Sequence, residues 1–203
     1  KTNGKLNRNP IKSVILKPGP EQGKDVMASS FIPDQNYGHH PEFSVYGWTN
    51  GGEPTIARQF IDFDLSKVQP NSVVHYAELC LFNSPYSRNA HRNGDHVGLD
   101  SIDGGIVERV VEPWEEFELT WNSMPKTDDN VQILFDRPEG IKGNLRIDVT
   151  DLVREMVKDP EGSHGFAIRL KNENYYRALI LGSSDCPDST LWPALKLSIQ
   201  EGI

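Results

Sequence analysis

The chain has 203 residues, with 21 Lys and Arg against 29 Asp and Glu and a formal net charge of −8. An acidic chain lacks the clustered cations on which binding to nucleic acids and anionic membranes depends, so we expect neither partner. No apolar run approaches the roughly 18 residues of a membrane span, which excludes a transmembrane segment, and the length suits one all-β domain.

The first 13 residues differ from the rest of the chain. They do not begin with Met, and they carry four cations and no acidic residue. Such a segment is typical of a disordered basic tether that follows a removed secretory or lipoprotein signal, or of an expression remnant. We therefore expect a tether at residues 1–13, one folded domain at 14–203, and a secreted or cell-surface protein that a lipid can anchor.

Short runs that alternate apolar and polar residues predict the strands. They lie at residues 14–16, 59–65, 77–81, 166–170, 178–181 and 195–199. Turn-forming clusters such as Lys17-Pro18-Gly19-Pro20 and Asn50-Gly51-Gly52 separate them. Many short strands with turn signals between them indicate a β-sandwich or a barrel.

One segment has helical spacing instead. Leu152, Val153, Met156 and Val157 recur at the interval of one helix face, and Asp159-Pro160 ends the pattern. The spacing predicts one short amphipathic helix at about residues 150–158, with Thr150 as its N-cap, lying across the end of the sandwich.

The residues that usually carry catalysis do not form a recognisable motif. Nucleophile and phosphate-binding motifs are absent, and the six histidines lack metal-ligand spacing. Cys80 and Cys186 form either one disulfide or two free thiols, of which free thiols are the more common outcome. We predict no catalytic residue, although a carboxylate pair for glycoside cleavage stays open because its separation is invisible in sequence.

Several segments in order resemble DNRLRE-type β-sandwich domains. The stretch from Trp114 to Pro125 is similar to their most recognisable motif, residues 58–66 with 74–81 to a strand pair, and residues 147–153 to a strand-to-helix element. The resemblance runs from about residue 14 to 200, although the hexapeptide that names the family is not found. It implies a jelly-roll-like antiparallel sandwich of secreted or surface-bound bacterial proteins, some of which are carbohydrate-binding modules, alginate binders included.

This resemblance moves the expected binding site away from the shared motif. Trp114 and Trp121 belong to that motif, so we expect them to stabilise the fold, and we look for a site in residues 43–58, 85–96 and 172–177. Sugar rings stack on exposed aromatic faces and Arg pairs with carboxylates, although any single aromatic is more often a packing residue. The candidate ligand-binding residues are Trp48, Arg58, Tyr86, Arg88, His91, Tyr175, Tyr176 and Arg177.

No cofactor is required by this prediction. Asp25 and Asn36 can share a structural calcium ion, as in other sandwich modules, or they can belong to a hydrogen-bonded turn. The turn is the simpler interpretation of the two.

Three functions follow from these patterns. The first is a noncatalytic carbohydrate-binding module that binds a polysaccharide through loop aromatics and Arg; an acidic glycan would require a local basic patch on this acidic chain. The second is a structural or adhesive surface module that contacts other surface proteins and has no small ligand. The third is a polysaccharide lyase or hydrolase.

Overall fold

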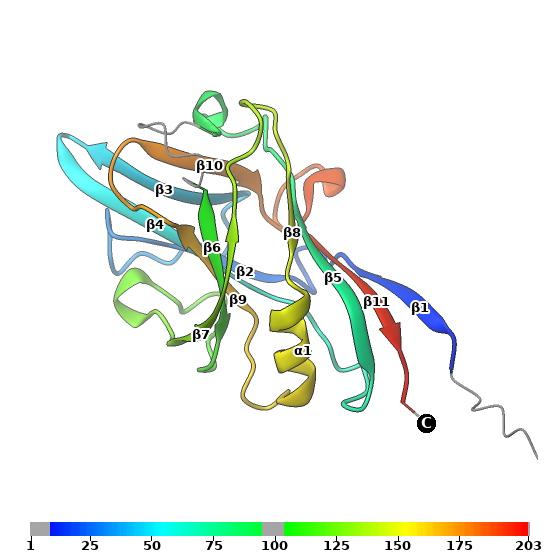
Figure 1. Ribbon diagram of the computed structural model, residues 1–203. Coiled ribbons are helices and arrows are strands. Elements are labelled where there is room, and N and C mark those ends of the chain that lie inside the picture. The colour runs from blue at the N-terminus through cyan, green and yellow to red at the C-terminus, as the bar shows by residue number, and fades with distance from the viewer. Residues whose placement is uncertain (1–8, 95–103, 203) are drawn as a thin grey trace, which may run out of the picture.

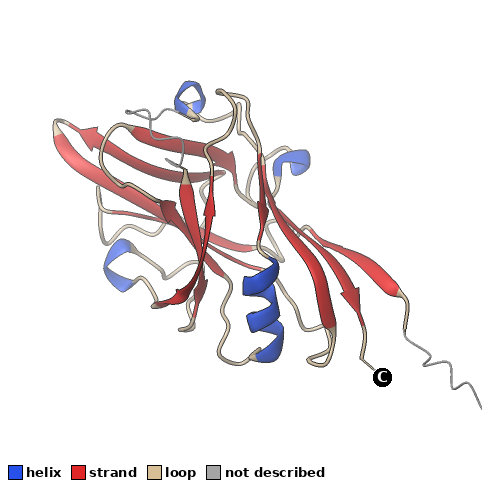
Figure 2. Cartoon of the chain, in the orientation of Figure 1, coloured by secondary structure: helices blue, strands red, loops and turns tan. Residues whose placement is uncertain are grey.

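The computed structural model describes residues 9–94 and 104–202. Strands dominate them, and a single α-helix stands among the described residues (Figure 2). The strands form two antiparallel sheets that face each other (Figure 1). The predicted all-β sandwich with one short helix is confirmed.

The smaller sheet has four strands. Their order is β1 (Ile11–Leu16), β11 (Ala194–Gln200), β5 (Val73–Leu81) and β8 (Leu145–Asp148). The strand predicted at residue 14 begins at Ile11, because Ile11 pairs with Gln200 and the Lys12 ammonium lies 2.8 Å from the Glu201 carboxylate. Residues 11–13 of the predicted tether are therefore part of a strand, and residues 1–8 lie outside the described residues.

The larger sheet has seven strands. Its order is β10 (Arg177–Gly182), β3 (Glu42–Asn50), β4 (Glu53–Asp62), β9 (Phe166–Leu170), β6 (Gly105–Val110) and β7 (Thr127–Phe135), while β2 (Lys24–Ser29) pairs with β4. Three short 3₁₀ turns complete the described elements, η1 (Ala90–Arg92), η2 (Trp121–Ser123) and η3 (Ser189–Leu191).

The core lies between the two sheets. Phe43, Phe166 and Leu179 from the larger sheet and Leu79 and Leu195 from the smaller one are fully buried in a single cluster. Burial of such side chains stabilises the fold by about 1.5–3 kcal/mol each.

A second apolar cluster covers the other side of the larger sheet. Trp114 packs there with Phe60 and Val26, and its indole nitrogen donates a 2.8 Å hydrogen bond to the carbonyl of His164. Trp114 is thus a packing residue, as its place in the Trp114–Pro125 motif led us to expect.

The helix α1 (Thr150–Lys158) occupies the predicted residues and buries its apolar face. It packs against β5 of one sheet and β6 and β7 of the other, at the end of the sandwich (Figure 1). Thr150 is the first helical residue and not the predicted N-cap, which is Val149. Asp148 Oδ1 accepts hydrogen bonds from the Thr150 amide (3.0 Å) and hydroxyl (2.5 Å). The Thr150 hydroxyl oxygen instead accepts from the Ala77 amide at 2.9 Å and so joins the helix to β5.

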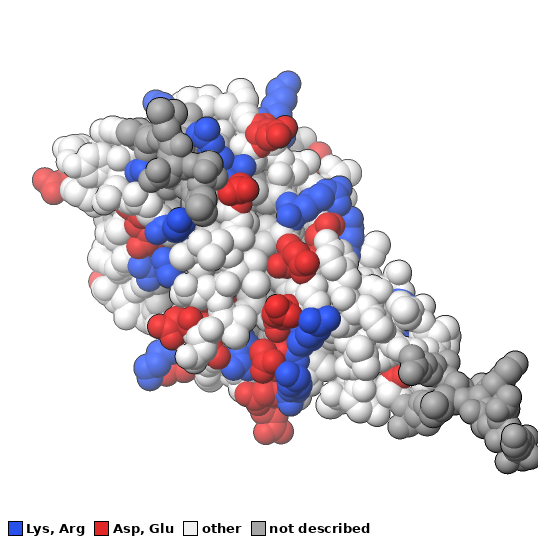
Figure 3. All heavy atoms as spheres, in the orientation of Figure 1, with Lys and Arg blue, Asp and Glu red and all other residues white. Residues whose placement is uncertain are grey.

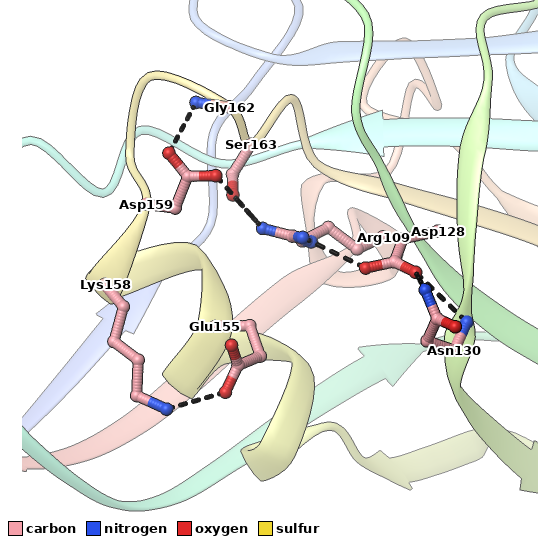
Figure 4. A network of polar contacts seen from close by, with 8 residues as sticks. All are labelled: Arg109, Asp128, Asn130, Glu155, Lys158, Asp159, Gly162 and Ser163. Carbon is pink, nitrogen blue, oxygen red and sulfur yellow. Dashed lines mark hydrogen bonds and ion pairs between the residues drawn. The ribbon is translucent and has the colours of Figure 1, made fainter.

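Charged side chains also tie α1 to the larger sheet. Arg109 on β6 lies 3.0 Å from Asp128 on β7 and 3.6 Å from Asp159 at the end of the helix (Figure 4). Around α1 the acidic and basic side chains alternate on the surface (Figure 3), in line with the Arg154–Asp151 and Lys158–Glu155 ion pairs.

Two further expectations concern cysteine and the membrane. Cys80 and Cys186 are both buried and free. Across residues 9–94 and 104–202, no helix combines the length and the apolar character needed to cross a bilayer.

A matched pair of substitutions tests which side chains form the core. Leu79→Ala removes a fully buried side chain, whereas Leu134→Ala removes one that is 53% exposed on β7. We expect Leu79→Ala to lower the free energy of unfolding by about 2–5 kcal/mol and Leu134→Ala by about 0.5 kcal/mol or less, measured by urea denaturation. Equal losses would contradict the assignment of the core.

Candidate ligand-binding groove

Strand β3 presents aromatic side chains to both of its faces. Phe43 and Val45 are part of the buried core. Successive residues of a strand point to opposite faces, so Tyr46 and Trp48 project away from that core. They form the floor of the candidate site.

Two adjoining cavities lie over these side chains. The first has a volume of about 380 Å³ and is lined by Trp48, Asn50 and Thr55 of the β3–β4 hairpin and by His91 and Arg92 of η1. The second has a volume of about 490 Å³ and is lined by residues that include His40, Glu42, Tyr86 and Arg88. Tyr46 and Asn89 line both, so the cavities form one continuous surface, which we call the β3 groove.

Trp48 is held in place from two directions. Its ring centroid lies 4.6 Å from that of Tyr176, and the Arg92 guanidinium carbon lies 4.9 Å from the Trp48 ring, within range of a cation–π interaction. The Tyr176 hydroxyl lies 3.1 Å from Thr49 Oγ1, and the Tyr175 ring continues the row 5.4 Å beyond Tyr176. The row provides an aromatic surface beside polar hydrogen-bonding groups.

Gly47 lets this row assemble. A Cβ atom at residue 47 would lie 2.3 Å from the Glu173 carbonyl oxygen and 2.7 Å from that of Asn174. Only glycine permits the segment before β10 to approach β3 this closely. The approach brings Tyr175 and Tyr176 next to Trp48.

The wall opposite the strands is the loop that contains η1, and Asn93 fastens it. This side chain is 1% exposed; its amide nitrogen donates to the carbonyls of Ile141 and Gly143, both at 3.2 Å, and its oxygen accepts from the Ile180 amide at 2.8 Å. A buried amide with all these bonds holds the loop firmly against β10. His91 and Arg92 are positioned over the groove as a result.

The charge of the groove differs from that of the chain. Among its described lining residues there is a single acid, Glu42. The basic side chains are His40, Arg88, His91 and Arg92. The Glu42 carboxylate accepts hydrogen bonds from the hydroxyls of Ser44 and Ser87. Because histidine is counted as neutral at pH 7, the described lining carries two cations and one anion, a small positive excess on an acidic protein.

The structure brings most of the predicted ligand-binding residues together. Trp48 and His91 line the first cavity, and Tyr86 and Arg88 line the second. Tyr176 contacts Trp48 and Tyr175 contacts Tyr176, but these two tyrosines are not part of the cavity lining.

Two predicted residues lie elsewhere. Arg58 is bound in a bidentate fashion by Glu173, with distances of 2.7 and 2.8 Å, and it also lies against the Trp121 ring. The hydrogen bonds to Glu173 raise the pKa of Arg58. Arg177 is buried and donates to the Asn174 carbonyl at 3.2 Å. The structure gives both side chains partners outside the groove lining.

Sequence reasoning missed Tyr46, Arg92 and Asn89 as groove residues. Tyr46 precedes Trp48 by two positions, and this period-two spacing is a signal that would have found it. Arg92 and Asn89 carried no such signal, because their positions depend on how Asn93 fastens the loop.

The proposed calcium pair, Asp25 and Asn36, lies away from the groove lining, beside the loop that contains Glu116. Asn36 donates from Nδ2 to the carbonyls of Glu116 and Leu119, both at 2.8 Å, and accepts from the Gly38 amide at 3.0 Å, which is the geometry of a hydrogen-bonded turn. Asp25 accepts from the Ser184 amide at 2.8 Å, and its own amide donates to Glu116 Oε1 at 3.0 Å.

The chain matches the model of a known protein family. The model of carbohydrate-binding module family 96 matches residues 21–191, a range that includes every residue of the groove described above. No curated protein matches the chain.

The Asp25 and Glu116 carboxyls make stability depend on pH. Burial raises the pKa of Asp25 to about 7 and that of Glu116 to about 7, from ordinary values of 3.8 and 4.5. The unfolded chain therefore loses these protons at a lower pH than the folded chain, and stability falls as the pH rises from about 4 to 7. In buffer without divalent cations, we expect Glu116→Gln to remove on the order of 2 kcal/mol of the loss between pH 5 and pH 8.

Thermal unfolding followed by circular dichroism measures this effect. Glu115→Gln is the matched control, because the neighbouring side chain is exposed. An equal pH dependence in Glu116→Gln and the unaltered protein would contradict the prediction.

Proposed function

Because the chain belongs to carbohydrate-binding module family 96, we propose that it is a noncatalytic module that binds a polysaccharide in the β3 groove. The observation that carries the proposal is the row of Trp48, Tyr176 and Tyr175 next to two joined cavities. A sugar ring has an apolar face that can stack on an aromatic ring. The flanking Asn, Thr and Arg groups can bind the hydroxyls of the sugar. The continuity of the cavities suits a chain of several sugars.

The charge of the groove favours an acidic polysaccharide over a neutral one. Arg88 and Arg92 bring guanidinium groups to the lining, and guanidinium pairs bidentately with carboxylates. The net charge of −8 by itself opposes a polyanion, so these two arginines are the local feature on which the preference depends.

The acid inventory of the groove supports a noncatalytic role. Glycoside hydrolysis generally uses two carboxylates about 5–9.5 Å apart. Of the lining residues that the structure describes, Glu42 alone carries a carboxylate, and two serine hydroxyls bind it. A hydrolase is therefore the less supported alternative, and membership of a carbohydrate-binding module family, a class that is generally noncatalytic, counts against a lyase as well.

We include in this proposal where the protein is located and whether it has a role other than glycan binding. Carbohydrate-binding modules are commonly extracellular, which supports a secreted or surface-bound bacterial protein, and the DNRLRE-type resemblance suggests the same setting. A structural or adhesive module that contacts other surface proteins is the second candidate, and the exposed Tyr86 side chain favours it as much as it favours glycan binding.

The aromatic contribution can be tested by affinity electrophoresis on immobilised polysaccharides. We expect Trp48→Ala to weaken retardation by at least about tenfold and Tyr86→Ala by a smaller factor. Tyr76→Ala is the control, because Tyr76 is 42% exposed on β5 of the other sheet. Full retention by Trp48→Ala, or no retardation of the unaltered protein on any glycan, would favour the adhesive role.

The charge preference has its own test. We expect binding to uronate-rich polysaccharides to exceed binding to neutral ones, and Arg88→Gln with Arg92→Gln to reduce it by roughly tenfold or more. Arg137→Gln, at an exposed arginine outside the groove lining, should leave binding unchanged. Isothermal titration at two salt concentrations measures the effect, and stronger binding to neutral glycans would contradict it.

A further inference from the structure

The strand orders of the two sheets end at β1, β8, β10 and β7, and three of these edges are protected. Residues 82–94 cover β10. The pairing of β7 with β6 is interrupted by a bulge, and β8 has four residues, of which Arg146 and Asp148 are exposed. Covering segments, bulges, short length and charge are the usual means by which proteins keep a sheet edge from pairing with another chain.

The fourth edge, β1, lacks such protection in the part of the chain that the structure describes. Within residues 9–94 and 104–202, β1 pairs with β11 alone, in one continuous register from Ile11 to Leu16. These six residues include no proline or glycine. A lysine on an edge strand usually opposes pairing, but the Lys12 ammonium lies 2.8 Å from the Glu201 carboxylate, so its charge is compensated within the molecule. The outer edge of β1 is therefore suited to accept another strand.

The side chains of β1 indicate which strand this is. Val14 and Leu16 pack against the core, so alternation directs Ile11, Ser13 and Ile15 to the outer face of the sheet. Ile11 is 58% exposed and Ile15 is 63% exposed. β-Branched side chains gain stability from cross-strand contacts with one another. The two isoleucines lie at equal distances on either side of Ser13, so β1 is complementary to a second copy of itself.

We propose that β1 pairs antiparallel with β1 of a second copy of this chain, about a two-fold axis that passes through Ser13. Such an axis, perpendicular to the sheet, keeps the outer faces of both copies on the same side. It places Ile11 of each copy opposite Ile15 of the other, so the exposed isoleucines form two cross-strand pairs. The two four-stranded sheets then form one continuous sheet across the dimer.

The surrounding sequence limits this pairing to two copies. Pro10 precedes β1 and Pro18 follows it by two residues, and proline has no N–H group to extend a ladder. A two-fold contact uses the same edge of both copies, so it is closed once it has formed. β1 also lies at the opposite end of the molecule from the β3–β4 hairpin (Figure 1), so the dimer leaves both β3 grooves accessible.

Sedimentation equilibrium of the full chain tests the association. A pair of six-residue strands buries less than the roughly 1,600 Å² of a standard interface, so we expect a Kd on the order of 10–100 µM. The mass should rise from 22.8 kDa toward about twice that value as the concentration passes through this range. Ile15→Lys should weaken association by at least about tenfold, because it places a charge opposite Ile11. Ile32→Lys is the control, at an isoleucine that is 47% exposed in the loop after β2.

A cysteine at the proposed axis tests the register. The two Ser13 Cα atoms would lie about 4.5–5.5 Å apart, within the range that a disulfide spans. Ser13→Cys, with oxidised glutathione as the oxidant, should therefore give a covalent dimer. Ser198→Cys is the control, because Ser198 lies opposite Ser13 on β11 and the two copies would be three strand spacings apart, about 14 Å. The native Cys80 and Cys186 are buried.

Three results would overturn the proposal. A monomeric mass of the unaltered protein at every concentration would leave the edge of β1 to a strand of another protein or to no partner. Equal association of Ile15→Lys and the unaltered protein, or equal cross-linking of Ser13→Cys and Ser198→Cys, would contradict the register. Masses beyond the dimer would contradict a closed two-fold contact. None of these measurements uses a glycan, so their outcome is independent of binding in the β3 groove.

Discussion

The edge of β10 is the constraint on which the β3 groove depends. As the last strand of its sheet, β10 would present unpaired main-chain groups, which are a liability in sheet proteins. Residues 82–94 cover this edge instead, through the Asn83–Leu181 bridge, the Gly94 amide bound to the Ala178 carbonyl at 2.9 Å, and the Asn93 side chain on Ile180. The segment that covers the edge also places η1 over β3. The same residues therefore protect the edge of β10 and form one wall of the groove.

The same strand connects the two regions of polar chemistry. Just before its first residue, Arg177, lies Tyr176, which packs beside Trp48, and after its last residue, Gly182, lies Ser184, whose amide binds the buried Asp25 carboxylate. Every residue of β10 is buried. A buried strand between them fixes the position of each region relative to the core.

The sequence predicted those features that depend on local pattern. Alternation placed the strands near Ile61, Leu79 and Ile168, and the spacing of Leu152 to Val157 placed the helix, because both patterns reflect a face that must be buried. The aromatic residues in predicted loops indicated the segments that form the groove. Partners distant in the sequence could not be predicted. Glu173 binds Arg58 from 115 positions away, and the Thr150 hydroxyl bonds to β5 while Val149 occupies the N-cap position expected of Thr150. The hydrogen bond between the Asp25 amide and Glu116, 91 positions away, was equally beyond prediction from the sequence.

The fastening of the loop by Asn93 has a thermodynamic consequence for recognition. Ordering a free loop of this kind on contact with a ligand would subtract conformational entropy from the binding free energy, at about 1–2 kcal/mol per residue. In this protein folding has already ordered the wall, so a glycan bound in the proposed groove would meet a fixed surface and retain more of the contact energy as affinity. Association should then proceed as docking onto a prepared surface, with the flexibility of the sugar chain as the principal entropic cost.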